Sequence, residues 1–173
     1  RFDGYLVVGE RAREYYLHYG APAARMQFVP HYVDNDYFRA HAAAADPEAL
    51  RAELGVAEGT QLALFVGKFM TKKRPVDVVR AVGQLRARGR DIEAVFVGAG
   101  DLESEIRAAA KDADVPLHLV GFKNQSEVPA YYAAADALVL PSDGGETWGL
   151  VVNEAMACGL PAVVSDAVGC GPD

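Results

Sequence analysis

The sequence predicts an α/β domain built on a doubly wound parallel sheet of Rossmann type. Two observations predict it: short apolar runs alternate with helical patterns along most of the chain, and these runs contain almost no polar position. Continuous apolar runs are typical of strands buried on both faces of a parallel sheet. Alternation of strand and helix then places the connecting helices on those two faces.

Core strands are expected from Leu62 onward, each a short run of apolar and often β-branched residues. They are residues 62–66, 94–97, 117–120, 137–140 and 162–164. Sheets of this kind bind ligands beyond the carboxyl ends of their strands. The loops that follow the strands are therefore where functional residues are expected.

The helices between these strands have recognisable ends. Asp46 is expected to cap a helix that begins at Pro47 and ends at Gly55. Pro75 opens a helix with one apolar face, and Gly89 ends it. Further helices are expected from residue 102, over 127–135 and over 149–158.

The part of the chain before residue 46 is less regular. Residues 5–8 and 26–29 are predicted strands, and a helix from about Glu10 to Gly20 lies between them. Residues 32–45 follow no period, and their alanine-rich end is interpreted as a linker.

Composition excludes several classes of function. The net charge is −7, so the chain lacks the basic excess of a general nucleic-acid binder. Its 2 cysteines favour a reduced, cytoplasmic setting over a disulfide framework. The apolar runs are far shorter than the ~20 residues of a membrane-spanning helix. The 4 histidines show no ligand spacing, so no metal site is expected.

A basic loop follows the first core strand. Residues 67–74 read Gly-Lys-Phe-Met-Thr-Lys-Lys-Arg in an otherwise acidic chain. Between a strand end and a helix N-terminus, free amide hydrogens and the helix dipole favour an anion. The glycine pattern of a P-loop is absent. The loop is either a diphosphate site or a solvated basic turn.

The next turn, Gly98-Ala-Gly-Asp101, allows close approach of another backbone or of a ligand. Glu103 stands where a dinucleotide fingerprint needs its last glycine, so that fingerprint is excluded. A tight strand-to-helix turn is the alternative.

Residues 141–161 carry the richest pattern. Three glycines, Gly144, Gly145 and Gly149, leave the main chain bare where a helix begins, which suits a phosphate. Glu154 lies within that helix among small and apolar neighbours, where a carboxylate needs a partner such as a ribose diol. Glu146 precedes the helix. The alternatives are a first-turn acid for Glu146 and an exposed helix position for Glu154.

Together these motifs resemble family-4 retaining glycosyltransferases of the GT-B fold, which consist of two domains. Residues 146–161, Glu-Thr-Trp-Gly-Leu-Val-Val-Asn-Glu-Ala-Met-Ala-Cys-Gly-Leu-Pro, are similar to the family's signature of two glutamates with seven residues between them. Lys68 and Lys73 resemble its basic pair. The family also resembles this chain at residues 29–34, Phe38, 120–122, 128–135 and 137–141, so the resemblance covers nearly the whole chain.

The resemblance implies a nucleoside diphosphate sugar as substrate, with no cofactor and no metal. Lys68 and Lys73 would neutralise the departing diphosphate, and Glu146 would contact the transferred hexose; these three are the implied catalytic residues. Glu154 would bind the ribose. The implied donor-binding residues are Gly67, Lys68, Lys73, Gly98, Val120, Phe122, Thr147, Trp148, Gly149, Leu150 and Glu154.

The resemblance also divides the chain. Residues 1–30 are expected to be the last strand and helix of an N-terminal acceptor domain, and residues 31–60 a crossover with a short helix. Residues 61–173 would be the C-terminal donor-binding domain, truncated at its end. A glycan or lipid-linked saccharide would bind through the rest of the N-terminal domain, so this chain alone would transfer no sugar. Peripheral membrane association of the full-length protein stays open.

Other interpretations remain beside this one. A sugar-nucleotide epimerase of the same fold, or a non-catalytic nucleotide-binding module, would share the sheet. Lys68 stands where the family usually has arginine, so bidentate phosphate geometry is lost while charge is kept. The pairs Asp34/Asp36 and Asp112/Asp114 match a metal-binding Asp-x-Asp pattern but follow no core strand, and surface positions are expected for them.

Overall fold

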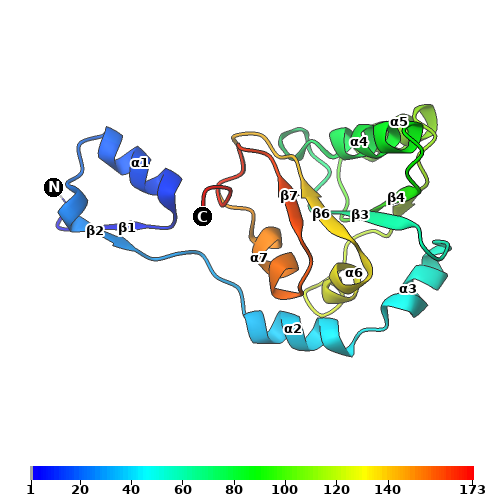
Figure 1. The fold of residues 1–173 in the computed structure, drawn as a ribbon. Coiled ribbons are helices and arrows are strands. Elements are labelled where there is room, and N and C mark those ends of the chain that lie inside the picture. Colours follow the sequence, from blue (N-terminus) through cyan, green and yellow to red (C-terminus); the bar gives the residue numbers. More distant parts are fainter. Residues whose placement is uncertain (1) are drawn as a thin grey trace.

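The main body of the protein is a parallel sheet whose strands lie in the order β5-β4-β3-β6-β7. The computed structural model describes residues 2–173. Figure 1 shows helices on both sides of this sheet, so the predicted doubly wound α/β fold is confirmed. The strands are β3 (Gln61–Val66), β4 (Ile92–Val97), β5 (Leu117–Leu119), β6 (Ala137–Leu140) and β7 (Ala162–Val164).

The helices lie where the sequence predicts them, with one exception described below. Asp46 accepts a hydrogen bond from the Ala49 amide at 3.0 Å, and Gly55 ends that helix in the left-handed conformation. Gly89 likewise follows the next helix with a φ of 80°. The helices of the main body are α3 (Pro47–Leu54), α4 (Pro75–Ala87), α5 (Glu103–Asp112), α6 (Val128–Ala134) and α7 (Leu150–Ala157).

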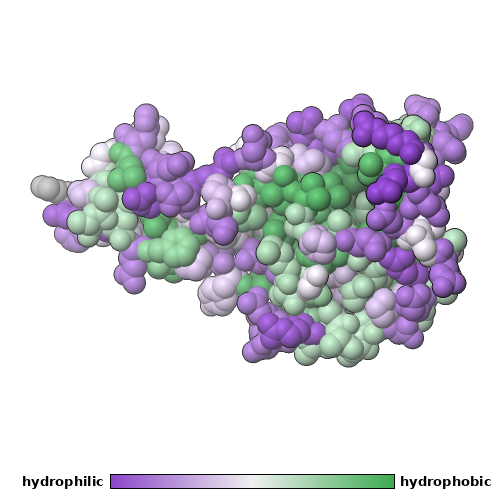
Figure 2. Space-filling model, in the orientation of Figure 1, coloured by the Kyte–Doolittle hydropathy of each residue, from purple (hydrophilic) through white to green (hydrophobic). Residues whose placement is uncertain are grey.

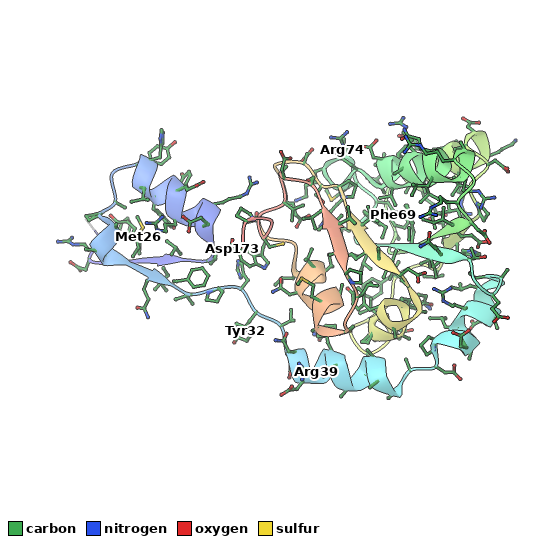
Figure 3. The ribbon with its side chains drawn as sticks, viewed as in Figure 1. Met26, Tyr32, Arg39, Phe69, Arg74 and Asp173 are labelled. Carbon is green, nitrogen blue, oxygen red and sulfur yellow. The ribbon has the colours of Figure 1, made fainter. Side chains whose placement is uncertain are left out.

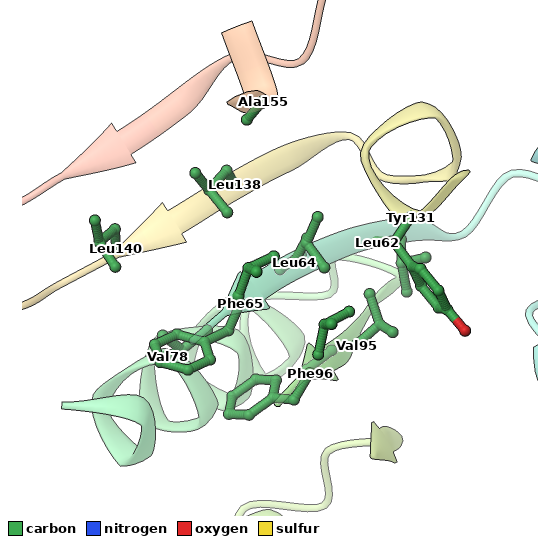
Figure 4. Close-up of a cluster of buried hydrophobic side chains, with 14 of the residues drawn as sticks. Leu62, Leu64, Phe65, Val78, Val95, Phe96, Tyr131, Leu138, Leu140 and Ala155 are labelled. Carbon is green, nitrogen blue, oxygen red and sulfur yellow. The ribbon is translucent and has the colours of Figure 1, made fainter. Parts of the chain in front are cut away.

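The core lies on both faces of the central strand β3. Leu64 and Phe65 are neighbours and therefore point to opposite faces, yet both are fully buried. On one face Phe65 contacts Phe96 of β4, with ring centroids 5.1 Å apart. Figure 4 shows these side chains with Leu138 of β6 in one continuous apolar cluster. The continuous apolar pattern of β3 thus reflects burial on two sides.

Cover of the sheet is less complete at β7. Val163 is 60% exposed, and a groove of about 390 Å³ between this strand and α4 is lined by apolar side chains that include Val139 and Leu85. Figure 2 shows apolar residues at the surface over β6 and β7. The prediction of buried strands therefore holds for β3 and β4 but not for β7.

The predicted linker at 42–45 is wrong, because residues Asn35–Ala44 form a helix, α2. The Asp34 carboxylate caps it by accepting a hydrogen bond from the Tyr37 amide at 2.9 Å. Phe38 is fully buried and lies against Tyr132, with ring centroids 6.5 Å apart. Only this one residue of α2 is buried. A helix with so narrow an apolar face leaves no clear period in the sequence.

The first part of the chain forms a separate two-stranded parallel sheet. Its strands are β1 (Tyr5–Val7) and β2 (Met26–Phe28), and the helix α1 (Glu10–His18) lies between them in the chain. Figure 1 shows this piece beside the main body, joined to it by the segment that leads to α2. At the contact, the Glu10 amide donates to both carboxylate oxygens of Asp173 at 3.2 Å. The assignment of residues 1–30 to a second domain stays a prediction.

None of the helices within residues 2–173 has the length and hydropathy that crossing a membrane requires. Cys158 and Cys170 are both free thiols.

Replacement of Phe38 by alanine tests whether α2 is held by this single anchor. We expect Phe38→Ala to lower the free energy of unfolding by about 3–5 kcal/mol, because it leaves a cavity against Tyr132. Urea denaturation measures the change. Arg39→Ala, on the exposed side of the same helix, should change it by no more than about 0.5 kcal/mol. Equal effects of the two substitutions would contradict the packing of α2.

Candidate functional site

The loops after β3 and β6 meet at the carboxyl edge of the sheet. β3 and β6 are adjacent and parallel, although β4 and β5 lie between them in the chain. From β3 the chain continues to β4 and β5 on one side of β3, and it then returns to form β6 and β7 on the opposite side of β3. This reversal of strand order makes the edge between β3 and β6 the switch point of the sheet. Doubly wound sheets bind ligands at such a point. Two predicted functional loops, 67–74 and 141–149, are thus brought together.

Phe69 anchors the basic loop in the core. It is fully buried, and its ring centroid lies 6.1 Å from that of Phe65. Its amide donates to the Ala99 carbonyl at 3.0 Å. In Figure 3, Phe69 lies inside the main body and Arg74 on the loop before α4. The loop is therefore held at Phe69 by both the side chain and the main chain of that residue.

Gly98 allows this loop to pack closely on the turn after β4. A Cβ on Gly98 would lie 2.0 Å from the carbonyl oxygen of Gly67, so no other residue fits there without movement. The close approach predicted for the turn is thus made by a neighbouring loop. Contact of Gly98 or Gly67 with a ligand stays a prediction.

Lys73 and Glu146 form an ion pair that joins the two loops. Their side chains are only 15% and 12% exposed. The Ser142 hydroxyl donates to the same oxygen, Oε2 of Glu146, at 3.2 Å. Two of the implied catalytic residues are therefore in direct contact, in a partly desolvated place where charge interactions are stronger than in water.

This geometry excludes the alternatives of a solvated lysine and a first-turn acid, while the predicted ligand contacts of both residues stay predictions. Lys73 is paired and largely buried, so it does not belong to a solvated turn. Glu146 is not a first-turn acid, because α7 begins at Leu150. Lys68 differs from them: it is exposed at the start of the loop.

Lys72 makes a second clamp between the loops. Its Nζ donates to the Gly145 carbonyl at 3.1 Å, and its own carbonyl accepts from the Asp143 amide at 2.9 Å. The sequence shows consecutive cations here and contains no signal that distinguishes the one that binds the glycine-rich loop. Lys72 was therefore missed as a member of the site, as was Ser142.

α7 begins with a bare backbone, as predicted. Its N-cap is Gly149, with a φ of 96°, and no side chain caps the helix. The first amides of a helix have no partner within the helix, so those of Leu150 and Val151 are open to an anion or to water. The start of α7 follows closely after Glu146 in the chain. Phosphate binding by these amides stays a prediction.

The side chain of Trp148 is used within the protein. It is 8% exposed, and its Nε1 donates to Asn153 Oδ1 at 2.9 Å. Its ring meets that of His31 edge to face, with centroids 5.3 Å apart. Only the main chain of Trp148 is therefore left for the predicted ligand contact. Thr147 beside it is exposed.

The loop after β5 lies next along the same edge. The Gly98 amide donates to the Gly121 carbonyl at 2.8 Å, which joins this loop to the turn after β4. Phe122 is 79% exposed, and Val120 is half-buried. The structure thus places an exposed aromatic ring at this edge, in the loop that contains two of the implied donor-binding residues.

Glu154 has a protein partner that the sequence did not reveal. The Tyr132 hydroxyl donates to Oε2 of Glu154 at 2.7 Å. Burial raises the pKa of Glu154 above its ordinary value, and the hydrogen bond from Tyr132 opposes that rise. The alternative of an ordinary exposed helix position does not hold, because Glu154 is half-buried. The predicted need for a partner is met at one of its two oxygens.

Some predicted or conspicuous features lie elsewhere. The four aspartates of the Asp-x-Asp pairs are exposed, and Asp34 is a helix cap. A hollow of about 610 Å³ between α2 and α7 contains none of the implied site residues. Residues 2–173 contain no group of three His, Cys, Asp or Glu side chains arranged to hold a metal ion.

Comparison with known proteins agrees with this doubly wound α/β fold. Residues 46–173 match the family described as Glycosyl transferases group 1, and the chain belongs to that family. It is 37% identical over 145 residues to 2-deoxystreptamine glucosyltransferase of Streptomyces kanamyceticus, covering 82% of this chain and 37% of that protein.

A second relative is D-inositol 3-phosphate glycosyltransferase of Arthrobacter sp. (strain FB24), 36% identical over 162 residues, with 89% of this chain and 37% of the relative covered. Among solved structures, Anabaena Alr3699/HepE in complex with UDP-glucose is similar with a TM-score of 0.74 and 19% identity, over 96% of this chain and 46% of that one. The chain thus spans 37% of the length of these curated relatives.

The Tyr132–Glu154 hydrogen bond leads to a prediction about titration. The Glu154 carboxyl should titrate above the ordinary range of glutamate, because burial disfavours its charged form. Tyr132→Phe should raise this pKa further, since the charged form loses its donor. Carbon-13 NMR of the carboxyl group across a pH series measures both values.

The raised pKa of Glu154 also makes the stability of the fold depend on pH. A carboxyl whose pKa is higher in the folded chain destabilises the fold above that pKa, and the effect disappears on acidification below the pKa of the unfolded chain. Tyr131→Phe is the matched control and should leave the titration of Glu154 unchanged. A Glu154 pKa that is normal, or insensitive to Tyr132→Phe, would contradict the pairing.

Proposed function

We propose that this chain is the donor-binding part of a retaining family-4 glycosyltransferase, which transfers a hexose from a nucleoside diphosphate sugar to a glycan or lipid-linked acceptor. The ion pair of Lys73 with Glu146 beside the uncapped start of α7 carries the proposal. This arrangement places a cation, a carboxylate and free amides at the switch point of the sheet. Membership of the glycosyltransferase family supports the same class of reaction.

The diphosphate would bind where these groups meet. Lys73 offers an ammonium group that is largely removed from water, and the amides at the start of α7 add donors and the positive end of the helix dipole. Lys68 is exposed and would approach the diphosphate from solvent. The UDP-glucose complex of the Anabaena protein supports a sugar nucleotide as the ligand here.

In the free chain Lys73 is already neutralised by Glu146. A bound diphosphate would therefore compete with Glu146 for the ammonium group. When Lys73 turns to the diphosphate, Ser142 would keep a hydrogen bond to Glu146, so the carboxylate is not left without a partner. Glu146 would then be available to a hydroxyl of the sugar to be transferred.

Transfer would break the bond between the sugar carbon and the diphosphate oxygen and form a bond from the same carbon to the oxygen of an acceptor hydroxyl, whose proton would leave with the diphosphate. Negative charge grows on the departing diphosphate as the bond breaks. Lys73, Lys68 and the α7 amides would stabilise that charge in the transition state, where pre-positioned donors contribute most. None of these steps as proposed requires a cofactor.

The acceptor would come from the side of the β1–α1–β2 piece. This piece contacts the main body through Asp173 at the N-terminus of α1, and His31, in the segment that follows the piece, lies against Trp148. In Figure 3, Asp173 lies between the two parts. Residues 1–30 would belong to the acceptor domain of a two-domain enzyme acting in the cytoplasm, and this chain alone would bind donor without transferring sugar.

Two substitutions of the ion pair test the proposal with opposite expected results. Lys73→Ala should weaken the binding of a nucleoside diphosphate by about 1.5–3 kcal/mol, because a charge-assisted contact is lost. Glu146→Gln should strengthen it by roughly 0.5–1.5 kcal/mol, because the diphosphate no longer competes with a carboxylate. Calorimetric titration with UDP, GDP and ADP measures both changes on the preferred nucleotide.

Matched controls separate local contacts from overall charge. Lys111→Ala removes a cation from the exposed end of α5, and Asp166→Asn removes an anion from the exposed loop after β7. Neither should change the affinity by more than a few tenths of a kcal/mol. Free nucleosides should bind all variants alike. Unchanged diphosphate affinity in Lys73→Ala, or no detectable binding of any of the three nucleotides, would overturn the proposed site.

A further inference from the structure

Tyr132 and Glu154 form a buried pair that the proposed transfer does not itself use. Tyr132 is 1% exposed, and its hydroxyl lies 2.7 Å from Oε2 of Glu154. The pair joins α6 to α7, and Phe38 of α2 lies against the tyrosine ring. Three helices therefore fix the position of this hydroxyl.

The hydroxyl acts as a donor only. Burial and the neighbouring carboxylate raise the pKa of Tyr132 above its ordinary value, so the phenol keeps its proton. An ionised carboxylate accepts and cannot donate. The direction of the hydrogen bond is thus fixed: Oε2 of Glu154 accepts from Tyr132, and the hydrogen bonds within residues 2–173 leave Oε1 free to accept from another group.

The two glutamates of the site are held in different ways. Glu146 is paired with the cation Lys73, and a bound diphosphate would draw the Lys73 ammonium group away from it. None of the ion pairs within residues 2–173 includes Glu154, and its side-chain partner is the neutral Tyr132. A hydroxyl donor fixes the direction of the carboxylate but leaves its charge in place. Oε1 therefore remains a strong acceptor for a neutral hydroxyl donor of a ligand.

We propose that Tyr132 is a positioning residue for sugar discrimination: by holding Oε2 of Glu154 it directs Oε1 to the 2′-hydroxyl of a bound ribonucleotide, so that ribonucleotides bind in preference to 2′-deoxyribonucleotides. The proposal rests on the proposed function and on the ribose contact that the family resemblance implies for Glu154. A 2′-deoxyribose would leave a half-buried carboxylate oxygen without its donor, and sites built around a hydroxyl reject analogues that lack it.

Without Tyr132 the carboxylate would lose this direction. A glutamate side chain has several rotatable bonds, and a free carboxylate can turn toward solvent and satisfy both oxygens there. The loss of one hydroxyl from the ribose would then cost little. The ratio of ribonucleotide to 2′-deoxyribonucleotide affinity therefore reports the positioning itself, whereas general loosening of the helices would weaken both nucleotides alike.

The experiment compares UDP, GDP and ADP with dUDP, dGDP and dADP by calorimetry on the 173-residue chain, and takes the best-bound pair. The unsubstituted chain should prefer the ribonucleotide by about tenfold or more, as expected for a hydrogen bond to a charged group. Tyr132→Phe keeps the buried ring and should reduce the preference to about twofold or less, with the affinity for the deoxynucleotide nearly unchanged.

The matched control is Tyr131→Phe. It removes a hydroxyl from the adjacent residue of α6, whose ring lies below Nζ of Lys123 at 5.7 Å. This variant should keep the full preference. A preference that persists in Tyr132→Phe, or a loss of affinity in that variant that is equal for both nucleotides, would overturn the positioning role.

Glu154→Ala distinguishes the ribose contact of Glu154 from the positioning role of Tyr132. If Glu154→Ala keeps the tenfold preference, the ribose contact that the resemblance implies for Glu154 is wrong, while the diphosphate site at Lys73 is still tested by Lys73→Ala. If Glu154→Ala abolishes the preference and Tyr132→Phe does not, only the role of Tyr132 is wrong.

A second measurement needs no substitution, in case Tyr132→Phe does not fold. In the intact chain, the NMR resonance of the Glu154 carboxyl carbon should shift on addition of the ribonucleotide and shift much less with the deoxynucleotide. Equal shifts with both nucleotides would overturn the proposal.

Discussion

The ion pair between Lys73 and Glu146 is the contact on which the candidate site depends. It joins loops that follow β3 and β6, which are neighbours in the sheet but far apart in the chain. Only a parallel sheet with its switch point at these strands brings the two loops together at their carboxyl ends. The strand order is therefore the physical reason that a lysine before α4 meets a glutamate before α7.

The loops around this pair are held firmly, so little of the site must reorganise when a ligand binds. The buried side chain of Phe69 anchors the basic loop in the core, and Lys72 joins this loop to the glycine-rich loop by a hydrogen bond. Gly98 and Gly169 are so close to neighbouring backbone that a side chain on either would collide. The movement expected on binding is confined to the exchange of partners at Lys73. Preformed donors of this kind are what stabilise charge that develops in a reaction.

Most of the fold could be predicted because its strands carry their own signal. The apolar runs of β3 and β4 are continuous, since neighbouring residues such as Leu64 and Phe65 are buried on opposite faces. α2 could not be predicted in the same way. Its one buried residue, Phe38, depends on a partner from α6, and such a contact between distant elements leaves no periodic pattern in the chain.

The same holds for the site: features set by neighbouring residues in the chain could be predicted, and contacts between residues far apart in the chain could not. The loops and the uncapped start of α7 follow from glycines and cations that adjoin strands, and these were predicted. The partners were not: Glu154 meets Tyr132, Lys72 meets Gly145, and the Trp148 side chain turns to Asn153. Each partner is set by packing of helices or loops. The assignment of the site residues to donor binding stays a prediction that the geometry supports.

A structure of the chain with its preferred nucleoside diphosphate tests the central claim most directly. The account predicts the diphosphate at the start of α7, with Nζ of Lys73 moved from Glu146 to a phosphate oxygen and Glu146 still bonded to Ser142. A diphosphate bound away from the switch point of β3 and β6, with the ion pair intact, would contradict it.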